Sequence, residues 1–311
     1  MKRLALFLTM LFACSLFLAA GAGAVDNVLN MTDVKTDKIF NTLAKLDLEN
    51  EEDQEKAKEF LDKWDLSIVT LSGKINHFGY NIFTGKPIDY HATVPGVSVW
   101  IAEYPCTRYL NFQSDETGWW TITVIKYKNE DLKFSFVYEK QGWVTTKCNV
   151  ITVTDEDNVD IAIQYIDPYY YYLALKPAVE AMIGVPLVNA MVVTVGKSWA
   201  SMHDDRLPHG DPGATVSSIP VLTYPETIGP IYFNEAVQPD PTYPYTSVDG
   251  GVTWINVPLN TYYVTAHKDG INYETVRFNL TEADVENGVE LYIASPPDSV
   301  QGDNDSDPGE W

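Results

Sequence analysis

The amino-acid sequence predicts a mainly β protein with two tandem antiparallel β-sandwiches behind a short helical segment. Three observations lead to this fold class. Apolar residues alternate with polar ones in about seven short runs between residues 66 and 166, as in the strands of a small sandwich. Turns rich in Gly and Asp separate these runs. A similar order of strand starts and turns comes again between residues 181 and 297, which indicates a duplicated unit.

Two landmarks align between the halves. A Gly-x-Pro strand start lies at residues 85–87 in the first half and at residues 184–186 in the second. A polar turn, residues 115–118 in the first half and 249–251 in the second, comes directly before an alternating run. These are turn and strand-start residues, so they predict architecture and carry little information about activity.

With these residues in view, each half resembles the carboxypeptidase regulatory-like domain. The resemblance covers residues 68–165 and 181–295, and it implies a transthyretin-like (prealbumin-type) sandwich. Modules of that family are mostly non-catalytic accessory, adhesion or carbohydrate-associated domains, so the resemblance implies binding in place of catalysis. The matching positions are Gly85 to Ile88, Asp115 to Gly118 and Gly142-Trp143 in the first half, and Gly184 to Leu187, Asn189 to Val192, Asp249 to Gly251, Gly270 and Tyr273 in the second.

The first residues predict a secretory signal over residues 1–24. Lys2 and Arg3 form a basic start, residues 4–20 are almost wholly apolar, and small residues precede an expected cleavage after Ala24. An uncleaved membrane anchor is the alternative. No later stretch is apolar for long enough to cross a membrane, so we expect a secreted, periplasmic or cell-surface protein of a bacterium.

Four other segments flank or interrupt the sandwiches. Residues 25–65 carry apolar positions at helical spacing and predict one or two short helices. Residues 167–180 form a Tyr- and Pro-rich connector, expected to be strand-like and packed across the interface, or else to expose tyrosines to a ligand. Residues 196–245 read as a long irregular insertion with many prolines, and residues 298–311 as an acidic tail.

The net charge is −22, and loss of Lys2 and Arg3 with the signal makes it −24. Such a surface repels phosphate backbones and anionic lipids, which excludes nucleic acid as a partner. It suits divalent cations, basic partners or solubility outside the cell.

Cys106 and Cys148 are the cysteines that remain after signal removal. An even pair in an oxidising compartment predicts a disulfide, worth about 4 kcal/mol in the loop-entropy model. A metal site on these thiols is the alternative.

The insertion contains the main candidate for metal chemistry. Imidazole and carboxylate groups that could ligate a transition metal or calcium lie close together there, although their spacing matches no standard motif. The candidate ligands are His203, Asp204, Asp205, His209 and Asp211.

The acidic tail offers a second, weaker metal candidate. Asp303, Asp305 and Asp307 are spaced as in a calcium loop, but Pro308 stands where the loop needs Gly. Solvated turns are the alternative for both clusters. No cofactor is certain, and calcium or another divalent metal is the candidate.

Aromatic residues of the insertion are candidates for stacking against a ligand such as a sugar. These are Trp199, Tyr232, Tyr243 and Tyr245, and packing into a sandwich core is the alternative for each.

No Gly-x-Ser-x-Gly or other nucleophile motif is present, so we expect no enzyme. The favoured function is an exported, non-catalytic binding or structural protein, whose partners are other surface or periplasmic proteins or a polysaccharide. A carbohydrate-binding protein is one alternative, and a metal-dependent hydrolase that uses residues 203–211 is another.

Overall fold

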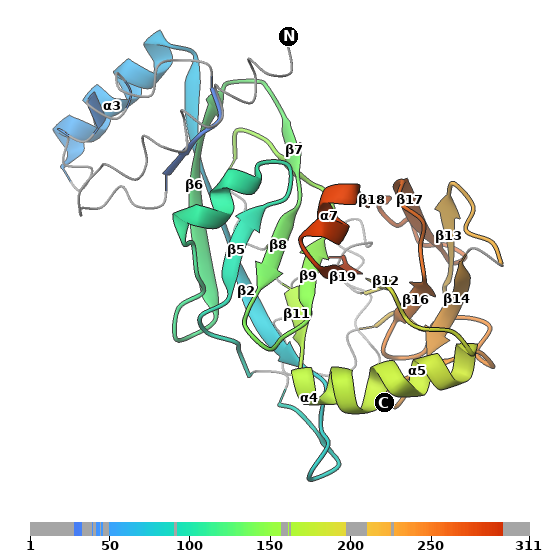
Figure 1. Ribbon diagram of the computed structural model, residues 1–311. Helices are drawn as coiled ribbons and strands as arrows, with labels where there is room; N and C mark the ends of the chain where they lie inside the picture. Colours follow the sequence, from blue (N-terminus) through green and yellow to red (C-terminus); the bar gives the residue numbers. More distant parts are fainter. Residues whose placement is uncertain are drawn as a thin grey trace, which may run out of the picture.

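The computed structural model of this chain describes residues 28–32, 39, 42–43, 45, 50–89, 92–156, 161, 163–196, 210–224 and 227–294. Within these ranges the protein is mainly β, as predicted, and Figure 1 shows the strands of the two halves side by side. Its central feature is one sheet to which both halves contribute. This sheet has eight strands in the order β15-β14-β16-β12-β19-β9-β8-β5.

The first half supplies one end of the central sheet and a second sheet that packs against it. The second sheet has the order β1-β6-β2-β11, in which β2 and β6 are antiparallel and the outer strands pair in parallel. Alternation along β6 explains its place, because Trp120, Ile122 and Val124 are buried while Thr121 is exposed. The strands are β1 (Val28–Asn30), β2 (Leu66–Phe78), β5 (Ser98–Ile101), β6 (Trp119–Tyr127), β8 (Phe136–Glu139), β9 (Thr145–Cys148) and β11 (Ile163–Ile166).

The second half covers the opposite face of the central sheet with a three-stranded sheet, β13-β17-β18. Tyr262, Val264 and Ala266 alternate along β17 and pack with Trp254 and Phe278 in one apolar core. The strands are β12 (Ala190–Thr194), β13 (Thr215–Ile219), β14 (Ile228–Phe233), β15 (Pro239–Asp240), β16 (Gly251–Ile255), β17 (Thr261–His267), β18 (Val276–Asn279) and β19 (Val289–Ile293).

The last strand joins the two halves. β19 pairs in parallel with β12 on one side and with β9 on the other, so that Tyr292 lies opposite Lys147 and Ile293 opposite Cys148. The two apolar cores are distinct, but the hydrogen-bonded sheet runs from one to the other without a break. The boundaries 66–166 and 181–297 therefore stay a prediction, made within a scaffold that has a shared sheet.

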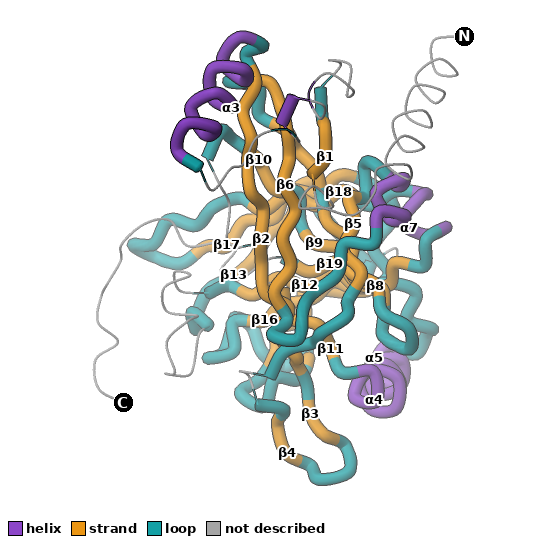
Figure 2. Tube along the Cα trace, turned by 90° about the vertical axis from the view of Figure 1, so that its left-hand side faces the viewer, coloured by secondary structure: helices purple, strands orange, loops and turns teal. Residues whose placement is uncertain are grey.

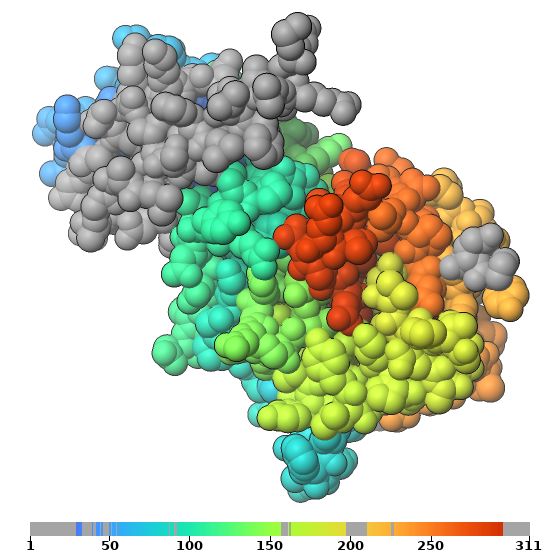
Figure 3. Space-filling view, viewed as in Figure 1, coloured from blue at the N-terminus to red at the C-terminus, as the bar shows by residue number. Residues whose placement is uncertain are grey.

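The connector is helical, so the prediction that it is strand-like is wrong. It comprises α4 (Pro168–Tyr170), the π-helical turn η2 (Tyr171–Leu175) and α5 (Lys176–Ile183). The start follows from local chemistry, because the Asp167 side chain accepts a 2.8 Å hydrogen bond from the Tyr170 N–H and Pro168 occupies the first helical position. Figure 2 shows this helix as the purple coil labelled α4 and α5, and in Figure 3 it forms the yellow-green surface beneath the second half.

The helix packs on residues from both halves. Tyr170, Tyr171 and Val179 form an apolar cluster with Val144 and Ile166 of the first half, and with four strand residues of the second, Ala190, Ile231, Ile255 and Leu291. This cluster covers the face of the central sheet that the first-half sheet leaves open.

Residues 196–245 do not form an irregular insertion, and this prediction is wrong for the part that the structure describes. They supply β13, which pairs with β17, as well as β14 and β15, of which β14 pairs with β16. Prolines interrupt the alternation at the end of β13 and inside β14, where the pairing register shifts between Ile228 and Ile231.

The N-terminal segment contains the predicted helix and one strand that was not predicted. α3 (Glu51–Lys63) begins at Asn50, whose side chain accepts a hydrogen bond from the Glu52 N–H, and its Phe60 and Leu61 pack on the first-half sheet. β1 is the additional strand.

Across the described ranges, no helix combines the length and the apolar character needed to cross a membrane. The shorter elements are β3 (Tyr80–Asn81), β4 (Lys86–Pro87), η1 (Pro105–Leu110), β7 (Leu132–Phe134), β10 (Ile151–Val153) and α7 (Glu282–Glu286).

Cys148 is a free thiol, so the predicted Cys106–Cys148 disulfide is wrong. Its position on β9 directs the side chain into the first-half core, where it is 1% exposed and its Sγ accepts a 3.1 Å hydrogen bond from the Phe136 N–H. Cys106 lies in η1, outside that core. Burial raises the pKa of the Cys148 thiol to about 12.

Candidate functional site

The predicted metal ligands fall largely outside the described residues. This holds for His203, Asp204, Asp205 and His209, as it does for the aromatic Trp199 and for the tail residues Asp303, Asp305 and Asp307. Among the residues that the structure does describe, no three His, Cys, Asp or Glu side chains gather into a group that could hold a metal.

Asp211 is the one predicted metal ligand that the structure places. Its carboxylate forms an ion pair with Lys268 and accepts a 2.5 Å hydrogen bond from the Tyr273 hydroxyl. Both carboxylate oxygens are therefore engaged within the second sandwich, which gives Asp211 a structural part there.

The three described stacking candidates differ in exposure. Tyr232 is 6% exposed and its hydroxyl accepts a hydrogen bond from the Val216 N–H, so its ring belongs to the core. Tyr243 is half-buried and donates its hydroxyl proton to Glu235, whereas Tyr245 is 51% exposed. A stacking role for Tyr243 and Tyr245 stays a prediction.

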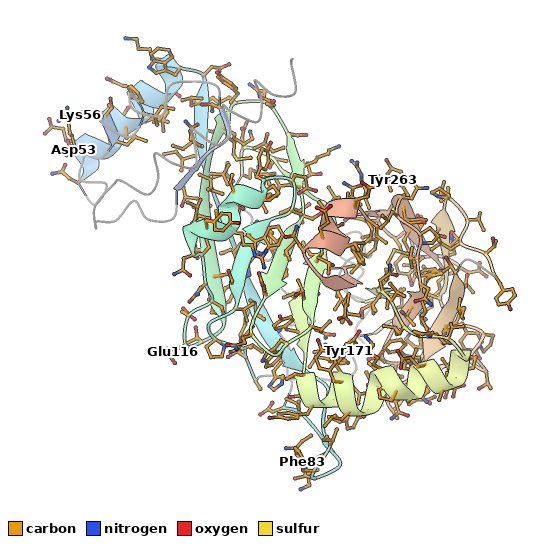
Figure 4. All side chains as sticks on the ribbon, in the orientation of Figure 1. Asp53, Lys56, Phe83, Glu116, Tyr171 and Tyr263 are labelled. Carbon is orange, nitrogen blue, oxygen red and sulfur yellow. The ribbon has the colours of Figure 1, made fainter. Side chains whose placement is uncertain are left out.

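A cavity lies between the connector helix and the central sheet. Its volume is about 80 Å³, and residues from η2, α5, β12, β14, β16 and β19 line it. The alternation of β12 and β16 creates the floor, because Val192 and Thr194 share a face with Thr253 and Ile255. Tyr171, labelled in Figure 4, belongs to the helical roof.

A second pocket adjoins this cavity and has a volume of about 220 Å³. The two share the lining residues Tyr170, Leu175, Val179 and Pro239, so they lie next to each other against the helix. We call the two together the connector groove. Its wall also contains the π-helical turn η2, a distortion of the kind often found at functional sites.

One carboxylate faces this apolar cavity. Asp249 lies in the turn before β16, and its Oδ2 accepts a 3.1 Å hydrogen bond from the Gly251 N–H. Burial raises the pKa of Asp249 to about 6, against 3.8 for an ordinary aspartate, and the hydrogen bond only partly offsets this. The same carboxylate contributes, after burial and Tyr80, to a Tyr170 pKa of about 12.

The matching turn of the first half has the opposite electrostatics. The Asp115 carboxylate accepts hydrogen bonds from the Thr117 hydroxyl, the Thr117 N–H and the Trp119 N–H, at 2.7, 2.8 and 3.0 Å. These bonds, with that from the Thr117 side chain first, lower the pKa of Asp115. Of these two turns, the one in the first half thus holds a well-solvated, hydrogen-bonded carboxylate and the one in the second half a desolvated carboxylate.

Lys176, the cationic side chain in the cavity wall, already has an acidic partner. The Lys176 Nζ lies 3.0 Å from Glu290 Oε2, and the Tyr171 hydroxyl donates to the same oxygen at 3.2 Å. Burial, followed by Glu290, raises the pKa of Tyr171. Lys176 therefore leaves the charge of Asp249 without a direct counterion.

Sequence reasoning found the Asp249 turn but missed the site. The signal was present in two separate pieces, the aspartate of the second repeat and the tyrosine run 169–172. Only the fold places the helix that begins at Pro168 over the turn at Asp249.

The fold and the groove define a β-sandwich protein with an apolar groove beneath a connector helix. No protein-family model matches the chain, and no curated protein matches its sequence. Among solved structures, the chain is similar to the TIE protein of Bacillus anthracis, with 12% identity, 73% of this chain and 33% of that chain covered, and a TM-score of 0.19.

Two other solved structures show similarity of the same order. For the major pilin subunit BcpA of Bacillus cereus the identity is 8%, the coverage is 76% of this chain and 57% of that chain, and the TM-score is 0.20. For a family 26 carbohydrate-binding module of Eubacterium rectale, solved with maltoheptaose, the identity is 10%, the coverage is 69% and 88%, and the TM-score is 0.18. The chain thus spans a third to about half of the first two. Scores this low carry no argument about function.

Proposed function

We propose that this chain is an exported, non-catalytic binding protein that holds an apolar ligand in the connector groove. The observation behind the proposal is the cavity itself, enclosed by apolar side chains of both the helix and the shared sheet. Ligand sites in proteins are usually pre-formed concave pockets that are mostly apolar and contain a few polar groups. A cavity in the core lowers the free energy of unfolding, so a cavity without a function would be a cost to the protein.

Catalysis is not favoured by the described geometry. A serine–histidine contact exists, with Ser217 Oγ 2.7 Å from His267 Nε2. Both residues are exposed on the outer face of the β13-β17 pair, and in the described part of the chain no acid hydrogen-bonds the imidazole. An activated nucleophile needs such an orienting group and a site that excludes water.

Binding in the groove is tested with 1-hexanol, a neutral ligand that matches its apolar wall. Titration calorimetry on the full chain should detect saturable binding, and hexanol should raise the midpoint of urea unfolding. Val179→Phe, which fills the wall common to both pockets, should abolish the binding. Leu173 lies on the same helix but is 62% exposed, so Leu173→Phe should leave hexanol binding unchanged. Absence of binding to the wild-type chain would refute the proposal.

A polysaccharide is the second candidate ligand, and a different surface favours it. Phe83 is 77% exposed and Tyr169 58% exposed, with their ring centroids 5.9 Å apart. Figure 4 places Phe83 at the tip of the β3–β4 hairpin, below the connector. Sugar rings stack on exposed aromatic faces. Retention on an immobilised glucan that Phe83→Ala removes, while Tyr109→Ala does not, would support this function.

The metal-dependent hydrolase that uses residues 203–211 also stays a proposal. The test is calcium and zinc binding by the full chain, compared with that of the His203→Ala/His209→Ala variant. Equal binding by both would end this alternative.

A further inference from the structure

We propose that the connector groove selects primary alkylammonium ligands, with the ammonium group held by the Asp249 carboxylate and the alkyl chain lying beneath the helix. This inference rests on the proposed function of the groove and adds the chemical class of its ligand.

The turn that contains Asp249 does not need a charged side chain. The Asp249 side chain makes one hydrogen bond, from the Gly251 N–H two residues on, and an asparagine side chain would accept the same bond. Asp115 in the matching turn differs, because three donors surround its carboxylate. The charge of Asp249 has no such structural use.

The charge of Asp249 faces the apolar cavity. Asp249 lines the cavity together with Phe233, Thr194 and Thr253 from the central sheet. Apart from the Gly251 N–H, no described donor satisfies its carboxylate. Burying an unpaired carboxylate is unfavourable, and a cation brought by a ligand would remove this penalty.

Few other charged or titratable groups face the Asp249 carboxylate. The helix contributes Tyr170, Tyr171 and Lys176 to the cavity wall, and the strands of the floor contribute no other ionisable side chain to it. Lys176 is paired with Glu290 at 3.0 Å. An ammonium ligand would therefore meet one net negative charge, with the rings of Phe233 and Tyr170 beside it to add cation–π attraction.

The groove also sets the shape of the ligand. The cavity of about 80 Å³ has room for a small head group and the first carbons of a chain. The adjoining pocket of about 220 Å³, lined by Ala174, Ala178 and Met182, would take the rest of an unbranched chain. An alkylamine of about six carbons fits these two volumes.

The test compares n-hexylammonium with 1-hexanol by titration calorimetry on the full chain at pH 7.5 and 150 mM salt, about physiological ionic strength. We expect the ammonium ion to bind at least about tenfold more tightly, since a charge-assisted hydrogen bond is stronger than a neutral one. Asp249→Asn should bring the two affinities together. Asp115→Asn removes the same formal charge from the matching turn and should leave the difference intact, which controls for general attraction of cations to an acidic protein.

The pH dependence gives an independent readout in the wild-type chain. With the pKa of Asp249 near 6, about a tenth of its carboxylates are ionised at pH 5, so hexylammonium affinity should fall about tenfold from pH 7.5 to pH 5. Hexanol affinity should not follow this change. If hexanol binds and hexylammonium binds no more tightly, the ammonium inference is overturned and the groove proposal stands. If neither binds, both are overturned.

Discussion

Replacing Asp249 by asparagine should make the folded protein more stable above pH 6. The folded-state pKa of Asp249 is about 6, and that of an ordinary aspartate is 3.8. In the unfolded chain the carboxylate ionises freely, whereas in the folded protein ionisation is opposed by burial. The folded state therefore binds more protons between about pH 4 and 6, and the free energy of unfolding falls as pH rises through this window.

The size of the effect follows from the shift. About two pKa units correspond to about 3 kcal/mol at 1.36 kcal/mol per unit, which is the upper limit of the gain in Asp249→Asn at pH 7.5. Asparagine keeps the hydrogen bond from the Gly251 N–H, so no compensating loss is expected. Below about pH 4, where both states are protonated, variant and wild type should have similar stability.

The assay is urea unfolding followed by tryptophan fluorescence at intervals from pH 4 to pH 7.5. Asp115→Asn is the matched control, because its pKa is lowered in the folded protein and its loss cannot stabilise. An Asp249→Asn variant that is less stable than wild type at pH 7.5 would refute the reasoning. So would a variant whose loss of stability between pH 4 and 6 equals that of the wild type.

Three further predictions concern two ion pairs and one buried thiol elsewhere in the protein. Lys147→Met should cost about 3–5 kcal/mol in urea unfolding, because Lys147 Nζ lies 2.8 and 2.9 Å from the oxygens of the buried Asp284 and the mutation leaves that charge unpaired; the double variant with Asp284→Leu should recover much of the loss, and no recovery would contradict this account. The hydrogen bond from Lys126 lowers the pKa of Asp155 to about 2, so the stabilising contribution of the Asp155 carboxylate is present above about pH 4 and is lost as pH falls toward 2. In Asp155→Asn the free energy of unfolding should therefore depend less on pH between about 4 and 2, and the same pH dependence as in the wild type would contradict this prediction. Cys148 should resist iodoacetamide in the native protein at pH 8 and react on unfolding, as mass spectrometry of alkylated peptides would show; rapid native labelling would mean that the core opens.

Local patterns predicted the elements whose neighbours are close in sequence. Alternation identified β6 and β16, and the turns at Asp115 and Asp249 lie before these strands as expected. The connector was predicted to be strand-like because tyrosines favour strands. It is helical because the Asp167 side chain caps the first turn and Pro168 fits the first helical position.

The pairing of β19 with β9 lies beyond local patterns. Residues of β9 near position 146 meet residues of β19 near position 291, and both strands would look equally complete as edges of separate sandwiches. The alternation of β13 and β14 was hidden by Pro220 and Pro230. The site was missed for the same reason as the shared sheet, because the helix over Asp249 and the turn itself lie far apart in the sequence.

The position of β19 also has a consequence for biogenesis. In synthesis from the N-terminus, β9 is complete well before residues 289–293 are made, so the edge of β9 that pairs with β19 stays open in the meantime. Parallel pairing between such distant segments is slow to form. A chain truncated before Val289 would therefore leave two open sheet edges, on β9 and on β12, that invite aggregation or pairing with another copy.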